Sequence, residues 1–177
     1  MLGPGRQNQK NLTPEARKAL LRRIKDFIAS DEDPVGYHRE NGHVHGTPNF
    51  LPWHRVFLQR FEDWQLTRLR NSSDFIPLVF WDPGDTFPVE FRQPDINPDP
   101  GLPDLWSELD AAGGLEVLDY TDFSRIVEEH HNAAHDALGG GMLDPMVSPQ
   151  VPVFWLLHSF YDHVFHTWEE RQESAAA

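Results

Sequence analysis

The sequence predicts a mainly α-helical fold, a four-helix bundle core with long irregular loops and minor β structure. Four segments repeat apolar residues at the three- and four-residue spacing of an amphipathic helix. Between the second and third of them lies a proline-rich stretch with a single strand-like run. With 177 residues, of which 39% are hydrophobic, the chain has the size of one domain with one core. We therefore expect a single domain over residues 1–177.

The first helix is expected at residues 14–30. Thr13 suits the N-cap, Pro14 suits the first helical position, and Glu15 places an acid in the first turn. The apolar residues that follow at helical spacing are Leu20, Ile24, Phe27 and Ile28. This pattern predicts an amphipathic helix that buries one face.

The second helix is expected at residues 52–70, in the run PWHRVFLQRFEDWQLTRLR. The residues on its buried face are His54, Phe57, Leu58, Phe61 and Trp64. Charged residues such as Arg60 and Asp63 fall largely on the opposite face. His54 is therefore predicted to point into the core.

The last two predicted helices also carry histidines among their apolar residues. Residues 122–138 align Val127, His131, Ala134, His135 and Leu138 on one stripe, and the triple glycine 139–141 predicts the end of that helix. Residues 152–171 align Phe154, His158, Tyr161 and Phe165. Imidazoles from both helices are thus expected on buried faces.

Residues 71–118 are expected to form a long irregular loop. They hold seven of the chain's 15 prolines and only one strand-like run, FIPLVFW at 75–81. Loops of this length are usually functional or disordered. The sequence leaves open whether the loop folds over a site that the helices form.

The charge and the lack of cysteine exclude several classes of site. The net charge of −13, from 15 Lys and Arg against 28 Asp and Glu, repels phosphate backbones and anionic lipid, so nucleic acid and membranes are poor partners. The chain has no cysteine, which excludes disulfides, thiolate metal sites and thiol nucleophiles. Any metal must bind to His, Asp or Glu.

Six histidines are candidate metal ligands: His38, His45, His54, His131, His135 and His158. His131 and His135 are four residues apart on one helical face, so they can bind one ion together. The others come from two further helices and from the segment that leads into the second helix. They divide into two sets of three, and all-nitrogen ligation favours copper or zinc over Mg²⁺ or Ca²⁺.

A buried histidine on its own is more often a hydrogen-bonded core residue than a ligand, but six on converging elements favour a metal site. The remaining four are assigned to the surface or to the surroundings of the ligands: His43, His130, His163 and His166. His43 is the alternative to His38 as the first ligand.

Three stretches resemble the copper motifs of the tyrosinase family. HGTPNFLPWHRVFLQRFE is similar to the first motif and matches it at His45, Phe50, Trp53, His54, Arg55 and Glu62. HHNAAHDALGGGM is similar to the second motif, with matches at His131, Asn132 and His135. VPVFWLLHSFYD is similar to the last motif, with matches at His158 and Asp162. An ion pair with Arg55 is expected for at least one of the two acids.

The resemblance implies two copper ions, the first on His38, His45 and His54 and the second on His131, His135 and His158. It also implies an oxidase that uses O₂ to convert o-diphenols to o-quinones and that ortho-hydroxylates monophenols. The alternatives are a catechol oxidase without hydroxylation, a hemocyanin-like O₂ binder, and a zinc hydrolase or metal-storage bundle.

The resemblance further implies catalytic residues. In the family, a water held by a Glu and by the Asn after the first ligand of the second copper takes the phenol proton, and Asn132 matches that Asn. Glu128 is the expected acid because it shares the helical face of the two ligand histidines, with Glu129 and Asp122 as alternatives. Asp136 is expected to place negative charge at the mouth of the site, which favours neutral or cationic phenols.

One position departs from the family pattern. Val151 stands where the family has the Asp that opens the last motif. The hydrogen bonds of that Asp are therefore either missing or supplied by Asp144 or Ser148.

The expected partners are small phenols and O₂, with no nucleic acid and no membrane. A copper-delivery protein is compatible with the resemblance, and the oligomeric state is left open. The N-terminal run MLGPGRQNQKNLTPEARK lacks the apolar core of a signal peptide. We therefore expect a cytoplasmic location, with export alongside a partner left open.

Overall fold

The structure is a computed structural model that describes residues 5–68 and 75–176. Within these residues the chain forms six α-helices and no β-strand. The α-helices are α1 (Pro14–Ile28), α2 (Pro34–Glu40), α3 (Phe50–Arg68), α4 (Leu105–Ala111), α5 (Tyr120–Leu138) and α6 (Pro152–Ala175). Five 3₁₀ turns join them: η1 (Gln9–Asn11), η2 (Gly42–Val44), η3 (Val89–Phe91), η4 (Gly140–Met142) and η5 (Ser148–Gln150).

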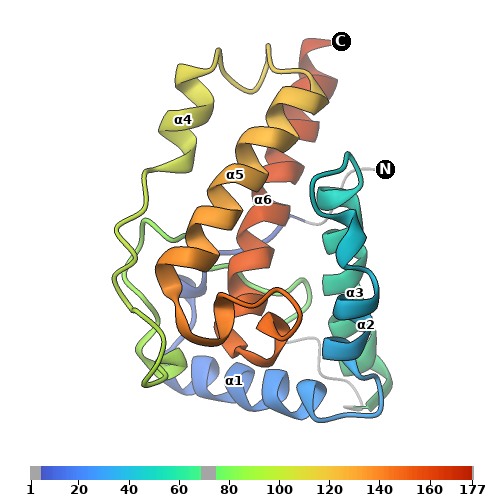
Figure 1. Cartoon of the computed structure of the whole chain (residues 1–177), viewed down its shortest axis with the longest axis vertical. Coiled ribbons are helices and arrows are strands. Elements are labelled where there is room, and N and C mark those ends of the chain that lie inside the picture. The colour runs from blue at the N-terminus through green and yellow to red at the C-terminus, as the bar shows by residue number, and fades with distance from the viewer. Residues whose placement is uncertain (1–4, 69–74, 177) are drawn as a thin grey trace.

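The helices gather around the long axis of the molecule. In Figure 1, α3, α5 and α6 run roughly along this axis, α2 lies beside α3, and α1 crosses beneath them. Helix α3 packs mainly on α6, and it also contacts α5. The mainly helical fold with irregular loops is confirmed. No helix of the described residues is both long enough and apolar enough to cross a membrane.

The four predicted helices are confirmed, with small shifts at their ends. Helix α1 ends at Ile28, α3 begins at Phe50, α5 begins at Tyr120, and α6 continues to Ala175. The predicted end of the second helix, at 69–70, lies outside the described residues, as does the start of the predicted loop at 71–74. Helix α5 ends before the three glycines as predicted, and Gly139 takes a φ of +72°, which favours glycine.

Two short helices were not predicted, because seven residues are too few to show helical periodicity. Both begin with an aspartate cap. The Asp33 side chain accepts from the backbone N–H of Gly36 at the start of α2, and Asp104 accepts from Ser107 at the start of α4. Helix α2 matters for the site, since it carries His38.

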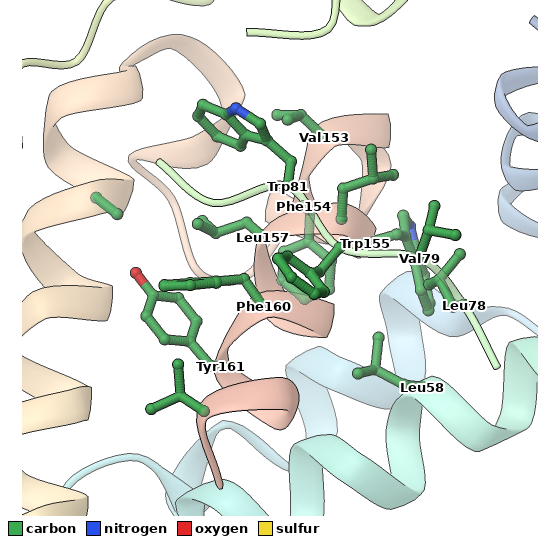
Figure 2. Packing of buried hydrophobic residues seen from close by; sticks show 14 of the residues in the cluster. Leu58, Leu78, Val79, Trp81, Val153, Phe154, Trp155, Leu157, Phe160 and Tyr161 are labelled. Carbon is green, nitrogen blue, oxygen red and sulfur yellow. The ribbon is translucent and has the colours of Figure 1, made fainter. Parts of the chain in front are cut away.

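The strand-like run 75–81 forms one isolated β-bridge, between Asn8 and Phe80, and otherwise is irregular, with a turn and bends at 75–77. The backbone N–H of Trp81 donates to the Leu156 carbonyl at 3.1 Å. Figure 2 shows Leu78, Val79 and Trp81 on this segment beside the α6 side chains. The run is therefore apolar because it is buried in the core, and not because it pairs in a sheet.

A buried ion-pair network ties the N-terminal segment to the two central helices. Arg6, whose side chain is fully buried, donates to Glu62 of α3 and to Asp162 of α6, both at 2.6 Å. Arg55 also donates to Asp162, as predicted. Glu62 accepts in addition from the backbone N–H of Leu78 at 2.9 Å. Because each buried charge is paired, removing one partner leaves another uncompensated.

Candidate metal centre

The first set of three histidines comes from three consecutive elements. His38 lies on α2, His45 directly follows η2, and His54 lies near the start of α3. One ring nitrogen from each lies within 4.8 Å of the others. We call these residues the first triad. The third member of this set is thus His38, which is buried, and not His43, which is exposed.

The second set comes from two helices. His131 and His135 are on α5 and His158 is on α6, with ring nitrogens again within 4.8 Å of one another. Nε2 of His158 lies 3.3 Å from Nε2 of His131 and 3.2 Å from Nε2 of His135. We call these residues the second triad.

Carbonyl oxygens fix the tautomer of four of the six rings. The Nδ1 contacts are His45 with Gly42 at 3.0 Å, His54 with Phe50 at 2.9 Å, His131 with the Asn132 side chain at 3.0 Å and His135 with Met142 at 2.8 Å. Because a carbonyl oxygen can only accept, Nδ1 of each ring carries the proton and Nε2 keeps a free lone pair. Those lone pairs point toward the centres of the triads.

The triads fit metal ions, because their ring nitrogens cannot all find hydrogen-bond partners among themselves. Nε2 of His158 meets two lone pairs and can donate one proton to only one of them. Four buried ring nitrogens of the two triads have no hydrogen-bond partner among the described residues: Nδ1 and Nε2 of His38, Nε2 of His54 and Nδ1 of His158. A buried polar group without a partner costs about 1–3 kcal/mol. One ion in each triad would accept three lone pairs and remove most of this cost.

Burial keeps the ligand imidazoles neutral. It lowers the pKa of His54, His131 and His158 well below the ordinary value, and the neighbouring imidazoles lower it further. It lowers the pKa of His38 to about 3 and that of His135 to about 4. Neutral rings are the form that binds metal, so near neutral pH no proton has to be displaced.

The two triads are in direct contact. The rings of His54 and His158 are stacked with centroids 4.5 Å apart. The Phe50 ring lies 4.8 Å from the rings of both His54 and His131. Two ions held here would therefore be neighbours in an apolar, aromatic surrounding.

A cavity of about 280 Å³ opens onto the ligands, and we call it the ligand-face cavity. Four of the six ligand histidines line it: His38, His45, His131 and His135. Four of its lining residues carry apolar side chains, Met142, Leu143, Pro145 and Met146, and we call them its apolar wall. Asn132 and Asp136 also line it, and both are exposed.

A second cavity, of about 520 Å³, lies between residues 45–48 and the outer side of α5, and we call it the side cavity. Glu128, Glu129 and Asn132 line it, so Asn132 borders both cavities. No lining residue of either cavity comes from the described part of the long loop, 75–118.

The candidate acids differ in what they contact. Glu128 accepts from the backbone N–H of Gly46 at 2.6 Å. Glu129 is exposed and pairs with Arg125 at 2.9 Å. Asp122 is exposed in the first turn of α5, nine residues before His131, which places it about 13 Å away along the helix axis. Of the three acids, Glu128 is therefore the one that contacts the residue directly after a ligand, Gly46.

The remaining histidines have other surroundings. His130 is buried, and its ring nitrogens contact the Tyr161 hydroxyl and the Pro103 carbonyl, both at 3.0 Å. His163 stacks on Phe80 with centroids 4.4 Å apart. His166 faces Glu170 at 3.4 Å.

At Val151, helix α6 begins with no side-chain hydrogen bond to its first turn. Asp144 instead accepts from the backbone N–H of Met146 at 2.9 Å, and the buried hydroxyl of Ser148 has no partner among the described residues. The hydrogen bonds of the family's Asp are therefore missing here. Pro152 at the first helical position lessens the loss, because it has no N–H to satisfy.

Sequence reasoning did not identify the groups that orient the ligands. Three of them are backbone carbonyls, of Gly42, Phe50 and Met142. Backbone groups leave no mark on the sequence, and only the His131–Asn132 pair could have been found from adjacent side chains.

Comparison with known proteins agrees with this site. The family profile described as the common central domain of tyrosinase matches residues 21–108 and 102–171. Hemocyanin type 2 unit e of Rapana venosa is 27% identical over 95% of the chain. The tyrosinases of Streptomyces lincolnensis and Streptomyces antibioticus are 24% and 26% identical over 97% and 96% of it. No solved structure matches the chain.

The relatives differ in how much of their length is matched. The chain spans 54% of the Rapana venosa unit and 84% of each Streptomyces tyrosinase. It spans only 14% of the A-type hemocyanin of Enteroctopus dofleini. The profile nevertheless covers most of the present sequence, including all six triad residues. The chain therefore belongs to the tyrosinase family, a dicopper family, and its two histidine triads are positioned to bind the metal ions.

Proposed function

We propose that the chain is a dicopper oxidase that uses O₂ to oxidise o-diphenols to o-quinones and that also ortho-hydroxylates monophenols. The observation that carries this proposal is the ligand-face cavity, which opens directly onto four ligand histidines. A site that only stores metal needs no such opening. The two Streptomyces relatives named tyrosinase support the same activity.

The apolar wall of the ligand-face cavity binds the phenol ring. Met142 and Met146 offer flexible thioether side chains that adapt to a flat ring, and Leu143 and Pro145 complete the wall. Bound copper supplies the electrons that reduce O₂. The wall orients the hydroxyl-bearing edge of the ring toward the histidines and excludes water from the opposite face.

Hydroxylation requires that a monophenol lose its proton, and the pKa of a free phenol is about 10. We assign this proton to Glu128, through a water that Asn132 also holds. Oε1 of Glu128 is bound to the backbone N–H of Gly46, so Oε2 is the oxygen assigned to accept the proton. Asn132 uses its amide oxygen to accept from His131, which leaves its NH₂ group for the water.

Asp136 sets the charge preference of the entrance. It is exposed and lines the ligand-face cavity, directly after the ligand His135. A carboxylate there attracts a cationic substituent and repels an anionic one. The proposed substrates are therefore neutral or cationic phenols.

The decisive experiment supplies the copper-loaded protein with catechol or with a monophenol and follows O₂ uptake and quinone absorbance. Quinone from both substrates, absent in His131→Ala, is the expected result. Quinone from catechol alone would reduce the function to a catechol oxidase. Reversible O₂ binding without quinone would favour the hemocyanin-like alternative, and hydrolysis by the zinc-loaded protein without oxygen chemistry would favour the zinc alternative.

A further inference from the structure

His45 differs from the other five ligands in the element that holds it. The other five lie on α-helices, whereas His45 begins a short non-helical segment, residues 45–49, between η2 and α3. Gly46 and Pro48 are exposed, and Gly46 takes a φ of +71°. The position of this ligand therefore depends on what holds the segment, which we call the His45 loop.

The internal hydrogen bonds of the His45 loop are local. Nδ1 of His45 donates to the Gly42 carbonyl, and the Thr47 hydroxyl donates to the Val44 carbonyl at 2.6 Å. These bonds attach the loop to the residues just before it, and its Thr47 and Asn49 carbonyls accept from the backbone N–H groups of Phe50 and Trp53 at the start of α3. They do not fix its distance from the helices of the second triad.

Two side chains of α5 bridge to the loop. Glu128 accepts from the Gly46 N–H at 2.6 Å, and the Tyr120 hydroxyl donates to the Pro48 carbonyl at 2.6 Å. The two residues are eight positions apart on α5, about 12 Å along its axis. The side cavity lies between them, so the loop spans an open space and is attached to α5 at both ends of it.

We propose that Glu128 and Tyr120 are positioning residues that hold His45 in the first triad and thereby set how long that triad retains its metal ion. Breaking one of the two contacts leaves the loop attached to α5 at one end only, so the His45 ring leaves the ion more often. This role uses Oε1 of Glu128 and needs only a hydrogen-bond acceptor. It is separate from the proton acceptance assigned to Oε2, and it rests on the metal site and not on the oxidase activity.

The test measures the loss of Zn²⁺ from the fully loaded protein to an excess of chelator. Glu128→Ala is expected to lose one of the two ions about tenfold faster or more, the usual effect of removing a group that orients a ligand. The loss of the other ion is expected to stay unchanged. Tyr120→Phe is expected to act on the same ion more weakly, because a neutral hydrogen bond is lost.

Two variants on the same helix serve as matched controls. Glu128→Gln keeps a carbonyl oxygen for the Gly46 N–H and is expected to release zinc within about threefold of the wild-type rate, a difference of about 0.7 kcal/mol. Glu129→Ala removes a neighbouring acid that pairs with Arg125, and it is expected to behave as wild type. Thermal unfolding of the metal-free variants verifies that each one folds.

A His45→Ala background provides the strictest check. If Glu128 acts through His45, adding Glu128→Ala to His45→Ala changes the release rates no further. Wild-type release from both Glu128→Ala and Tyr120→Phe would overturn the proposal. Equal acceleration of both ions, equal damage by Gln and Ala at position 128, or an added effect in the His45→Ala background would also overturn it. None of these results depends on whether the protein oxidises phenols.

Discussion

The two triads hold chemically identical ligands in different ways. The second triad is carried by two long helices, and Nε2 of His158 lies 3.2–3.3 Å from Nε2 of His131 and of His135. The first triad is assembled from a seven-residue helix, a loop and a third helix. Long helices fix their side chains through many backbone hydrogen bonds, whereas a loop depends on a few side-chain contacts. The geometry of the second triad is therefore set mainly by its helices, and that of the first depends partly on the contacts that hold the His45 loop.

The largest expected effect concerns metal stoichiometry. Copper analysis of the wild type should give about two ions per chain, falling to one or fewer in His54→Ala and in His131→Ala, because three nitrogens are needed for each ion. His38→Ala should lower the count, while His43→Ala, at an exposed position, should keep it at two. An unchanged count in His54→Ala or His131→Ala would contradict the ligand assignment.

Acid should destabilise the metal-free protein through both triads. The folded-state pKa values of His38 and His135 are lowered to about 3 and about 4. The unfolded chain binds protons on these rings below about pH 6.5, whereas the folded chain does not. The free energy of unfolding is therefore highest above pH 6.5, where these rings are neutral in both states. It falls as the pH is lowered toward 4, by at most about 1.4 kcal/mol per pH unit for each histidine.

Urea unfolding of the metal-free protein between pH 6.5 and 4.5 measures this loss. His135→Gln removes one of the titrating rings and should make the dependence on pH shallower. His43→Ala removes an exposed ring and should leave it unchanged. An identical slope in wild type and His135→Gln would mean that His135 is protonated in the folded state.

A smaller effect is expected at the proton acceptor beside the second triad. Glu128→Gln or Asn132→Ala should lower monophenol turnover at least tenfold, about 1.4 kcal/mol in the barrier, while catechol oxidation changes much less. Steady-state kinetics with both substrates provides the measurement. Parallel loss of both activities, or no loss in either, would contradict the proposed proton transfer. Catechol oxidase would then be the better description of the protein.

The smallest effect is expected at Asp136, because it is exposed and its field is screened by solvent. The wild type should show a higher kcat/KM for tyramine than for a phenylpropionate, by a few-fold, about 1 kcal/mol or less. Asp136→Asn should flatten or reverse this preference, and raising the salt concentration should weaken it. Equal kcat/KM values for the two substrates in the wild type would contradict the charge effect.

The parts of the site that were predictable lie on long elements with periodic sequences. His54, His131 and His158 sit on helices whose apolar pattern already placed them in the core. His38 was a less certain choice because α2 has only seven residues, which are too few to show helical periodicity. Contacts between distant segments could not be predicted. The bond from Glu128 to Gly46 joins residues 82 positions apart and depends on how the His45 loop packs against α5.

The Arg6 network also bears on when the protein can acquire copper. Arg6 and Asp162 are separated by 156 positions, so this contact cannot form until nearly all of the described chain has left the ribosome. The last ligand, His158, lies one turn before Asp162 on the same helix. Neither the closed second triad nor the buried ion pairs between α3 and α6 can form before α6 has been synthesised. The site for two ions is therefore complete only after α6 has been synthesised.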